Sequence, residues 1–294
     1  MINENCPLCG SANNTILYDL LKPKVHADIG LPGIVKECKS CGLIFKTFQK
    51  WPENIYDDDY AKTFLQIKDY SGTHAIDFFK KILQATYNRI IKNNPKPTLL
   101  DVGSGIGIML ETAKEVGYEV TGVELSEKLA AIAEKKGFNV INKNVSEIDS
   151  SIKYDTITMM DIIEHLVDPR DILQNLKDKL KAGGELIIYT PNHNSFIVKI
   201  SNVLYRLGIK SPIENIFACT HTCFFTTATL KKIIEETGYT IIEVHHFNYD
   251  ISRPGQKVSL IAKIGVSIIE KIGNLTGFNG FRLVIYAQPS IKNK

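Results

Sequence analysis

The chain has 294 residues, of which 44% are hydrophobic and 23% charged, and its formal net charge is +3. This composition is typical of a globular protein with one substantial domain and room for a small one. The weak net charge, and the presence of only five arginines among the 35 basic residues, argue against nucleic acid as a partner.

The N-terminal sequence MINENCPLCG lacks the basic segment and the apolar core of a secretory signal. No stretch reaches the roughly 18 apolar residues that a membrane span needs. The longest candidate, 258–272, is interrupted by three charged residues and is expected to form a packed helix. Six cysteines without a signal peptide indicate a reducing compartment. We therefore expect a cytoplasmic protein; no feature of the sequence indicates an oligomeric state.

Two C-x-x-C pairs organise residues 1–50, which we expect to form a separate module. Cys6 and Cys9 lie in CPLCG, and Cys38 and Cys41 lie in CKSCG. Two residues between thiolates let both bind one tetrahedral ion. The gap between the pairs exceeds the usual ~15–20 residues, which a longer ribbon loop accommodates. This spacing predicts a zinc ribbon with structural Zn²⁺, and leaves redox-active thiols or disulfides as the alternatives.

Residues 51–97 are expected to hold a linker and N-terminal helices. An aromatic and acidic stretch covers 55–64. Apolar residues at a spacing of three to four predict a helix from about His74 to Lys92. Pro95 and Pro97 end that helix.

From Thr98 onward, short β-rich runs alternate with helical patterns. This alternation predicts an α/β fold with a mostly parallel sheet covered on both faces. Ligands in such folds bind beyond the carboxyl ends of the strands. The expected strands are 98–102, 119–125, 138–141, 154–160, 185–192, 239–247 and 281–287, and the expected helices are 109–117, 127–137, 168–184 and 226–238.

Residues 194–212 carry apolar side chains at helical spacing between two expected core elements. We interpret this segment as a helix that packs over the active site as a lid. A surface helix that touches a membrane or a lipid-linked acceptor is the alternative, so peripheral membrane contact stays open.

A glycine-rich turn follows the first expected strand, 98–102. Glycines in such a turn let a ligand approach the backbone N–H groups closely. Glu124, at the end of the second strand, is placed to accept hydrogen bonds from ribose hydroxyls. A dinucleotide-binding turn needs its third Gly or Ala five positions after the first. Here Ile108 holds that position and Gly107 comes one residue early, which weakens a nicotinamide interpretation.

Four segments occur in the order and spacing of one family: LLDVGSGIG, VTGVELSEK, YDTITMMDIIEHLVDP and LKAGGELIIYTPN. They resemble class I S-adenosylmethionine (SAM)-dependent methyltransferases, in the small-molecule branch that acts on quinols and sugars. The resemblance covers about Thr98 to Phe247. It implies a Rossmann-like seven-stranded sheet over 98–294, with a lid or acceptor insertion at about 191–225, and SAM as cofactor.

The resemblance also implies roles for individual residues. It places Asp101, Gly103 and Gly105 at the backbone turn and at the methionine end of the cofactor. It also places the transferred methyl group in a pocket beside Met160 and Asp161. The remaining implied contacts are Glu124 to the ribose, Leu125 and Asn144 to the adenine, and Tyr60, with Tyr56 beside it, closing over the cofactor.

A hydroxyl acceptor must also lose its proton, for which histidine is suited near neutral pH. His165 in EHLVDP and His221 in THTCFF are the two candidates, and a structural role is the alternative for each. Cys219 and Cys223 alternate with His221, but a fourth ligand is missing, so we do not predict a second metal site there.

These observations predict methyl transfer to a small-molecule acceptor, namely a hydroxyl of a sugar, glycan or quinol-like compound. A nicotinamide-dependent oxidoreductase is the competing enzyme class. A non-catalytic adaptor, in which the zinc ribbon precedes a degenerate Rossmann-like domain, is the third interpretation.

Overall fold

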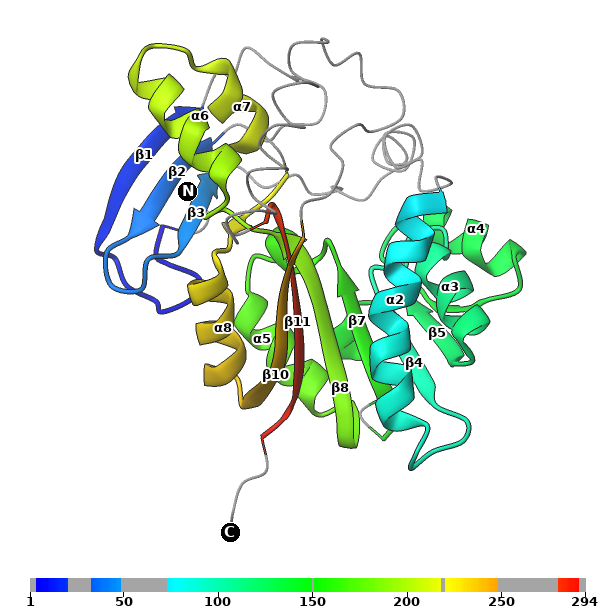
Figure 1. The fold of residues 1–294 in the computed structure, drawn as a ribbon. Coiled ribbons are helices and arrows are strands. Elements are labelled where there is room, and N and C mark those ends of the chain that lie inside the picture. The colour runs from blue at the N-terminus through cyan, green and yellow to red at the C-terminus, as the bar shows by residue number, and fades with distance from the viewer. Residues whose placement is uncertain are drawn as a thin grey trace.

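A computed structural model describes residues 4–20, 33–48, 73–149, 151–217, 220–247 and 280–290. Within these ranges the chain forms a seven-stranded sheet flanked by helices and a separate four-stranded sheet (Figure 1). Tyr56, Tyr60 and Cys219 lie outside the described residues, as does the helix expected at 258–272.

The large sheet has the strand order β10-β11-β8-β7-β4-β5-β6. Strands β6, β5, β4, β7 and β8 are parallel to one another, whereas β11 runs antiparallel to both β8 and β10. This arrangement confirms the prediction of a Rossmann-like, mostly parallel seven-stranded sheet. The strands are β4 (Thr98–Val102), β5 (Glu119–Val123), β6 (Asn139–Ile141), β7 (Tyr154–Met160), β8 (Leu180–Pro191), β10 (Tyr239–Phe247) and β11 (Arg282–Pro289).

Helices cover both faces of this sheet because its central strands are apolar on both sides. On one face α2 and α3 pack over residues such as Leu99 and Ile187, and on the other α5 and α8 pack over Leu100 and Ile188. The helices are α2 (Thr73–Ile90), α3 (Ile108–Val116), α4 (Glu127–Lys135), α5 (Pro169–Lys177) and α8 (Thr227–Glu236), and the 3₁₀ turns are η1 (Val145–Glu147) and η2 (Ile163–His165).

One predicted helix is shorter than expected. The helical pattern at 168–184 ends at Lys177, and β8 already begins at Leu180. Leu180 pairs with Tyr154, and the register then shifts before Glu185 pairs with Thr156. Gly183 has a left-handed φ of 75° in this irregular stretch. The glycines therefore lie inside an irregular strand and not at the exit of a helix.

The small sheet has the order β1-β2-β3-β9 and is antiparallel throughout. Its first three strands come from the N-terminal 48 residues, but β9 comes from the end of the insertion expected at about 191–225. The strands are β1 (Asn14–Leu20), β2 (Gly33–Cys38), β3 (Ile44–Phe48) and β9 (Cys223–Phe224).

The insertion forms two helices, α6 (Phe196–Arg206) and α7 (Ser211–Phe217). These helices lie beside the small sheet (Figure 1). Val198 and Phe217 pack with Tyr18 and other core residues of the small sheet. The buried face of this segment therefore lies on the small sheet and not on the seven-stranded sheet. A lid role for the segment stays a prediction.

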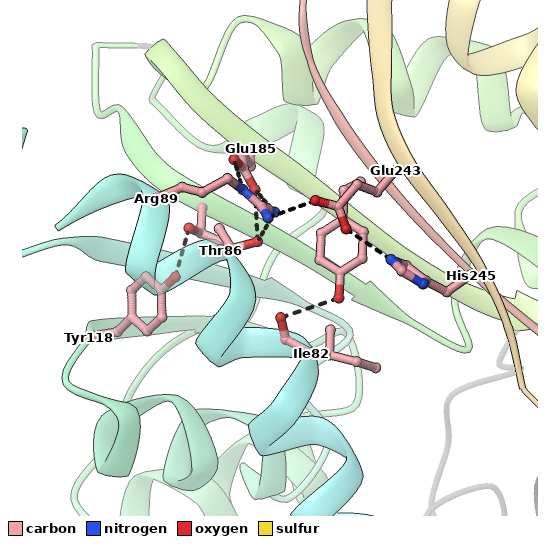
Figure 2. Close-up of polar contacts among 9 residues, drawn as sticks. Ile82, Thr86, Arg89, Tyr118, Glu185, Glu243 and His245 are labelled. Carbon is pink, nitrogen blue, oxygen red and sulfur yellow. Dashed lines mark hydrogen bonds and ion pairs between the residues drawn. The ribbon is translucent and has the colours of Figure 1, made fainter. Parts of the chain in front are cut away.

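A polar network fastens α2 to the large sheet (Figure 2). Arg89 donates from Nε and Nη2 to the two carboxylate oxygens of Glu185, each at 2.7 Å, and from Nη1 to Glu243 at 3.0 Å. Thr86 also donates to Glu185, at 2.7 Å. Glu185 is fully buried, so these donors compensate a charge removed from water.

No helix within the described ranges is long and apolar enough to cross a membrane.

Candidate active site

The carboxyl end of β4 runs into the predicted glycine-rich turn. Gly103 has a φ of 75°, and a Cβ atom at this position would lie 2.1 Å from Cδ1 of Ile162. A side chain here would be strained at this positive φ and would displace the Ile162 side chain, so the position favours glycine. The backbone at the end of β4 consequently lies directly against the side chain of Ile162, in the connection that follows β7.

Glu124 closes this turn from the neighbouring strand. Its carboxylate is buried and accepts a hydrogen bond from the Gly105 N–H at 2.8 Å and one from the Ser126 N–H at 2.8 Å. Each bond uses a different carboxylate oxygen. The hydroxyls of Ser104 and Ser126 are also buried, with no hydrogen-bond partner among the described residues. A bound ligand is one kind of partner that can satisfy such groups.

Asp101 lies beneath the same turn. It is buried, and the Thr158 hydroxyl donates to it at 2.7 Å. Burial raises the pKa of the Asp101 carboxyl to about 7, and the negative charge of Glu124 acts in the same direction. A cationic ligand group beside Asp101 would stabilise its charged form.

The two residues predicted to contact the adenine lie near the protein surface, after β5 and β6. Leu125 is 44% exposed. Asn144 caps η1, where its side chain accepts from the Ser146 N–H at 3.1 Å. The sequence did not single out Asn142, whose amide donates to the carbonyl oxygens of Glu124 at 2.7 Å and Leu125 at 3.1 Å. Asn142 therefore holds the end of β5 in position.

Asp161 follows β7 in an unusual conformation. It is the one non-glycine residue with a positive φ, 55°, in the described part of the chain. Its carboxylate pairs with Arg282 of β11, whose guanidinium lies over the Tyr189 ring at 5.0 Å from the centroid. No sequence pattern pointed to Arg282, because only the antiparallel return of β11 brings it to this edge.

The two candidate histidines meet just beyond Asp161. The rings of His165 and His221 lie edge to face with centroids 4.7 Å apart. Glu164 lies beside them, and one ligand atom from each of these three residues lies within 4.8 Å of the other two. His193, which the sequence analysis did not include, is buried 6.5 Å from His221 between ring centroids.

Burial shifts the pKa values of the ionisable side chains in this cluster. It raises the pKa of the Glu164 carboxyl to about 8, and the nearby Asp161 charge adds to that effect. Burial also lowers the pKa of His221 well below its ordinary value, with the charge of His165 as a further cause. The pKa of His193 falls to about 3 because that ring is also buried.

The four N-terminal cysteines form a separate cluster. Their sulfur atoms all lie within 4.8 Å of one another, and the Cys6–Cys41 and Cys9–Cys38 sulfur pairs are each 3.5 Å apart. None of the five described cysteines forms a disulfide. Neighbouring sulfurs around a tetrahedral zinc ion are about 3.8 Å apart, given Zn–S bonds of ~2.3 Å. These thiols are thus close enough to bind one ion.

The strand order, the glycine-rich turn and the acidic residue that ends β5 together define a Rossmann-like methyltransferase fold of class I. A family model described as a methyltransferase domain matches residues 75–244, which is more than half of the chain. The chain therefore belongs to the methyltransferase domain family, and it is a SAM-dependent methyltransferase.

Similar proteins carry names of the same kind. A ubiquinone biosynthesis O-methyltransferase of Dinoroseobacter shibae is 28% identical over 178 residues, covering 55% of this chain and 69% of the relative. One from Coxiella burnetii is 36% identical over 161 residues, covering 51% and 67%. A SAM-dependent methyltransferase structure from Archaeoglobus fulgidus has a TM-score of 0.48 at 25% identity, covering 76% of this chain and 98% of that chain.

Family membership favours the methyltransferase interpretation over both alternatives drawn from the sequence, the nicotinamide-dependent oxidoreductase and the non-catalytic adaptor.

Proposed function

We propose that the protein methylates a hydroxyl group of a sugar, glycan or quinol-like small molecule. The observation that carries this proposal is the edge-to-face pair of histidines, His165 and His221, beside the turn that follows β7. His165 lies in η2, which follows β7, and ligands in parallel α/β sheets bind beyond the carboxyl ends of the strands. The names of the ubiquinone biosynthesis O-methyltransferases support a hydroxyl as the acceptor.

The residues of the glycine-rich turn fit the cofactor. Glu124 would hold the ribose hydroxyls, while Asp101, Gly103 and Gly105 would hold the methionine end. Two observations support this fit: the tight packing of Gly103 against Ile162 leaves no room for a side chain there, and the buried Ser104 hydroxyl lacks a partner among the described residues. When bound, SAM supplies a methyl group already activated on a sulfonium.

The remaining proposed contacts are those to the adenine and to the transferred methyl group of the cofactor. Leu125 and Asn144 would contact the adenine, and Met160 and Asp161 would line the pocket for the transferred methyl. Asp161 has a left-handed φ of 55°, and the side chain of the next residue, Ile162, lies against Gly103 at the end of β4. Tyr60 stays a proposed contact of the cofactor.

On the acceptor side the protein mainly orients the nucleophile. Holding two reacting groups in line can supply roughly 7–11 kcal/mol of the barrier. His165 and His221 would act on the acceptor hydroxyl as it loses its proton. His165 is held in place by a hydrogen bond between its Nδ1 and the Thr220 hydroxyl at 3.2 Å.

We further propose that Cys6, Cys9, Cys38 and Cys41 bind a structural zinc ion. Gly10 and Gly42, which follow the two pairs, have left-handed φ values of 71° and 78° and donate hydrogen bonds to the first cysteine carbonyl of each pair. These turns aim both thiols of each pair at one point. Residues 1–50 would then form the zinc ribbon, 51–97 the linker and helices, and 98–294 the catalytic domain.

Calorimetric titration of the purified protein with S-adenosylhomocysteine (SAH), with NADH in parallel, tests the cofactor assignment. Micromolar binding of SAH alone is expected, and binding of NADH alone would overturn it. The acceptor is tested by incubating the protein and SAM with panels of catechol-type quinols and of sugars. Mass spectrometry should find a product 14 mass units heavier on oxygen. Methylation of only amine or carbon acceptors would contradict the proposal.

A further inference from the structure

The cluster of Glu164, His165 and His221 has the donor set of a metal site. One ligand atom of each residue lies within 4.8 Å of those of the other two. The residues come from two distant parts of the chain, since Glu164 and His165 belong to η2 and His221 precedes β9. The fold therefore builds this cluster from side chains that the sequence separates by more than fifty positions.

Two atoms of the cluster are buried without a hydrogen bond. Glu164 is 1% exposed; its Oε2 accepts from the Thr190 hydroxyl at 2.8 Å, while its Oε1 has no partner among the described residues. The Nδ1 atom of His221 is in the same situation. A buried polar atom left unpaired costs about 1–3 kcal/mol. A ligand at this point would remove that cost for both atoms at once.

The surroundings fix the orientation of these donors. Thr220 holds His165 through its Nδ1, which is the kind of outer hydrogen bond that orients metal-binding histidines. The Thr222 N–H donates to the Glu164 carbonyl at 2.8 Å, and the Thr222 hydroxyl donates to the Leu166 carbonyl at 2.6 Å. The segment that carries His221 is thereby fastened to η2, so the donors are held together without a ligand.

We propose that Glu164, His165 and His221 bind a divalent transition-metal ion that in turn binds the oxygen of the methyl acceptor. Two imidazoles and one carboxylate suit such ions as Zn²⁺ or Mn²⁺, and three protein ligands leave a coordination position open for a substrate. This inference rests on the proposed function, because it assigns the open position to the acceptor hydroxyl.

The chemistry balances without an added oxidant or reductant. A hydroxyl bound to a divalent cation has a lowered pKa, and its proton passes to bulk water. The freed oxygen lone pair forms the bond to the methyl carbon. The carbon–sulfur bond breaks with its electron pair staying on sulfur, which becomes a neutral thioether. His165 and His221 would then be ligands that position the acceptor, in place of proton acceptors.

The test is a titration of the purified full-length protein with Mn²⁺, followed by electron paramagnetic resonance of the free ion. Thiolate sites select softer ions, so Mn²⁺ reports on the Glu164 cluster. We expect one Mn²⁺ per chain, with the dissociation constant raised at least tenfold in Glu164→Gln and in His221→Ala. His245→Ala removes a surface histidine of β10 and should bind Mn²⁺ as the unaltered protein does.

SAH calorimetry on each variant checks that the sheet is folded. If Glu164→Gln fails to fold, His165→Gln replaces it, because His165 is less buried than Glu164. No Mn²⁺ binding by the unaltered protein, or equal binding by all variants, would overturn the metal site. Mn²⁺ binding without SAH binding would leave the metal site standing and overturn the proposed function, so the two failures are distinguishable.

Discussion

At the scale of single residues, the candidate cofactor site depends on two buried carboxylates with different tasks. Glu124 is held by two backbone N–H groups, which keep its charge and fix its direction. Asp101 accepts one hydroxyl hydrogen bond beneath the turn and its pKa is raised to about 7. Glu124 is therefore preorganised as an anion, whereas Asp101 gains its charge most readily beside a cation.

Glu124→Ala should weaken SAH binding by about 1.5–3 kcal/mol, the range for hydrogen bonds to charged groups. The variant loses the proposed contacts to both ribose hydroxyls and also releases the Gly105 N–H. Calorimetry measures the change. Leu125→Ala, at the exposed neighbouring position, is the control and should change the affinity less. An unchanged affinity in Glu124→Ala would rule out the ribose assignment.

The raised pKa of Asp101 predicts a pH dependence of stability. The folded protein binds this proton more tightly than the unfolded chain, where the pKa is near 3.8. The contribution of Asp101 is therefore most favourable below pH 4 and is lost as the pH rises to about 7. Relative to Asp101→Asn, the free energy of unfolding of the unaltered protein should fall across this window. Urea denaturation without ligand at pH 4.5, 6 and 7.5 measures it, and a constant difference would contradict the prediction.

At the scale of elements, α2 is fastened to β8 by the Arg89–Glu185 pair (Figure 2). Arg89→Met leaves the buried Glu185 carboxylate without its main partner, which should cost about 3 kcal/mol. Urea denaturation measures this loss. Adding Glu185→Gln to Arg89→Met should recover part of it, because the double variant buries no unpaired charge. Equal stability of Arg89→Met and the unaltered protein would show that the pair does not hold the helix.

The small sheet is the element that depends on the cysteine cluster. Cys38→Ser should release the proposed zinc ion, because three thiolates bind it more weakly than four. Metal analysis should find stoichiometric zinc in the unaltered protein and much less in the variant. Cys223→Ser is the matched control, since Cys223 is buried on β9 and lies outside the cluster. Zinc retained in Cys38→Ser would argue against the site.

At the scale of the whole molecule, the small sheet packs against the large one. Its strand β9 pairs with β3 and begins two residues after His221. Leu8 and Phe45 of the N-terminal region also belong to the same core cluster as Leu173 and Leu230, which lie on α5 and α8. The small sheet therefore supports the proposed acceptor side of the site, while Asp101 and Glu124 depend on β4 and β5.

Loss of zinc should therefore affect SAH binding and Mn²⁺ binding to different extents. In Cys38→Ser, SAH affinity should stay within about twofold of the unaltered protein, whereas Mn²⁺ binding at the Glu164 cluster should weaken by tenfold or more, because His221 loses its support. Calorimetry and electron paramagnetic resonance measure the two quantities on one preparation. An equal loss of both would indicate that the small sheet supports the whole fold and not one side of the site.

Local sequence determined most of the large sheet. β4, β7 and β10 occupy the predicted residues, because short apolar runs bounded by turns specify buried strands without reference to distant parts of the chain. The glycine-rich turn and the cysteine pairs were recognisable for the same reason: their chemistry depends on spacings of a few residues. The start of β8 was mispredicted, since its first residues have a helical pattern and only pairing with β7 makes them a strand.

The sequence alone thus determined the fold class, the cofactor and the residues that follow each strand. Tertiary structure decided which of those residues meet. Arg282 reaches Asp161 only because β11 returns antiparallel, and His221 reaches Glu164 because Thr222 hydrogen-bonds to the backbone at η2 and β9 pairs with β3. Contacts between positions far apart in the chain depend on how elements pack, and packing leaves no periodic signal at either position.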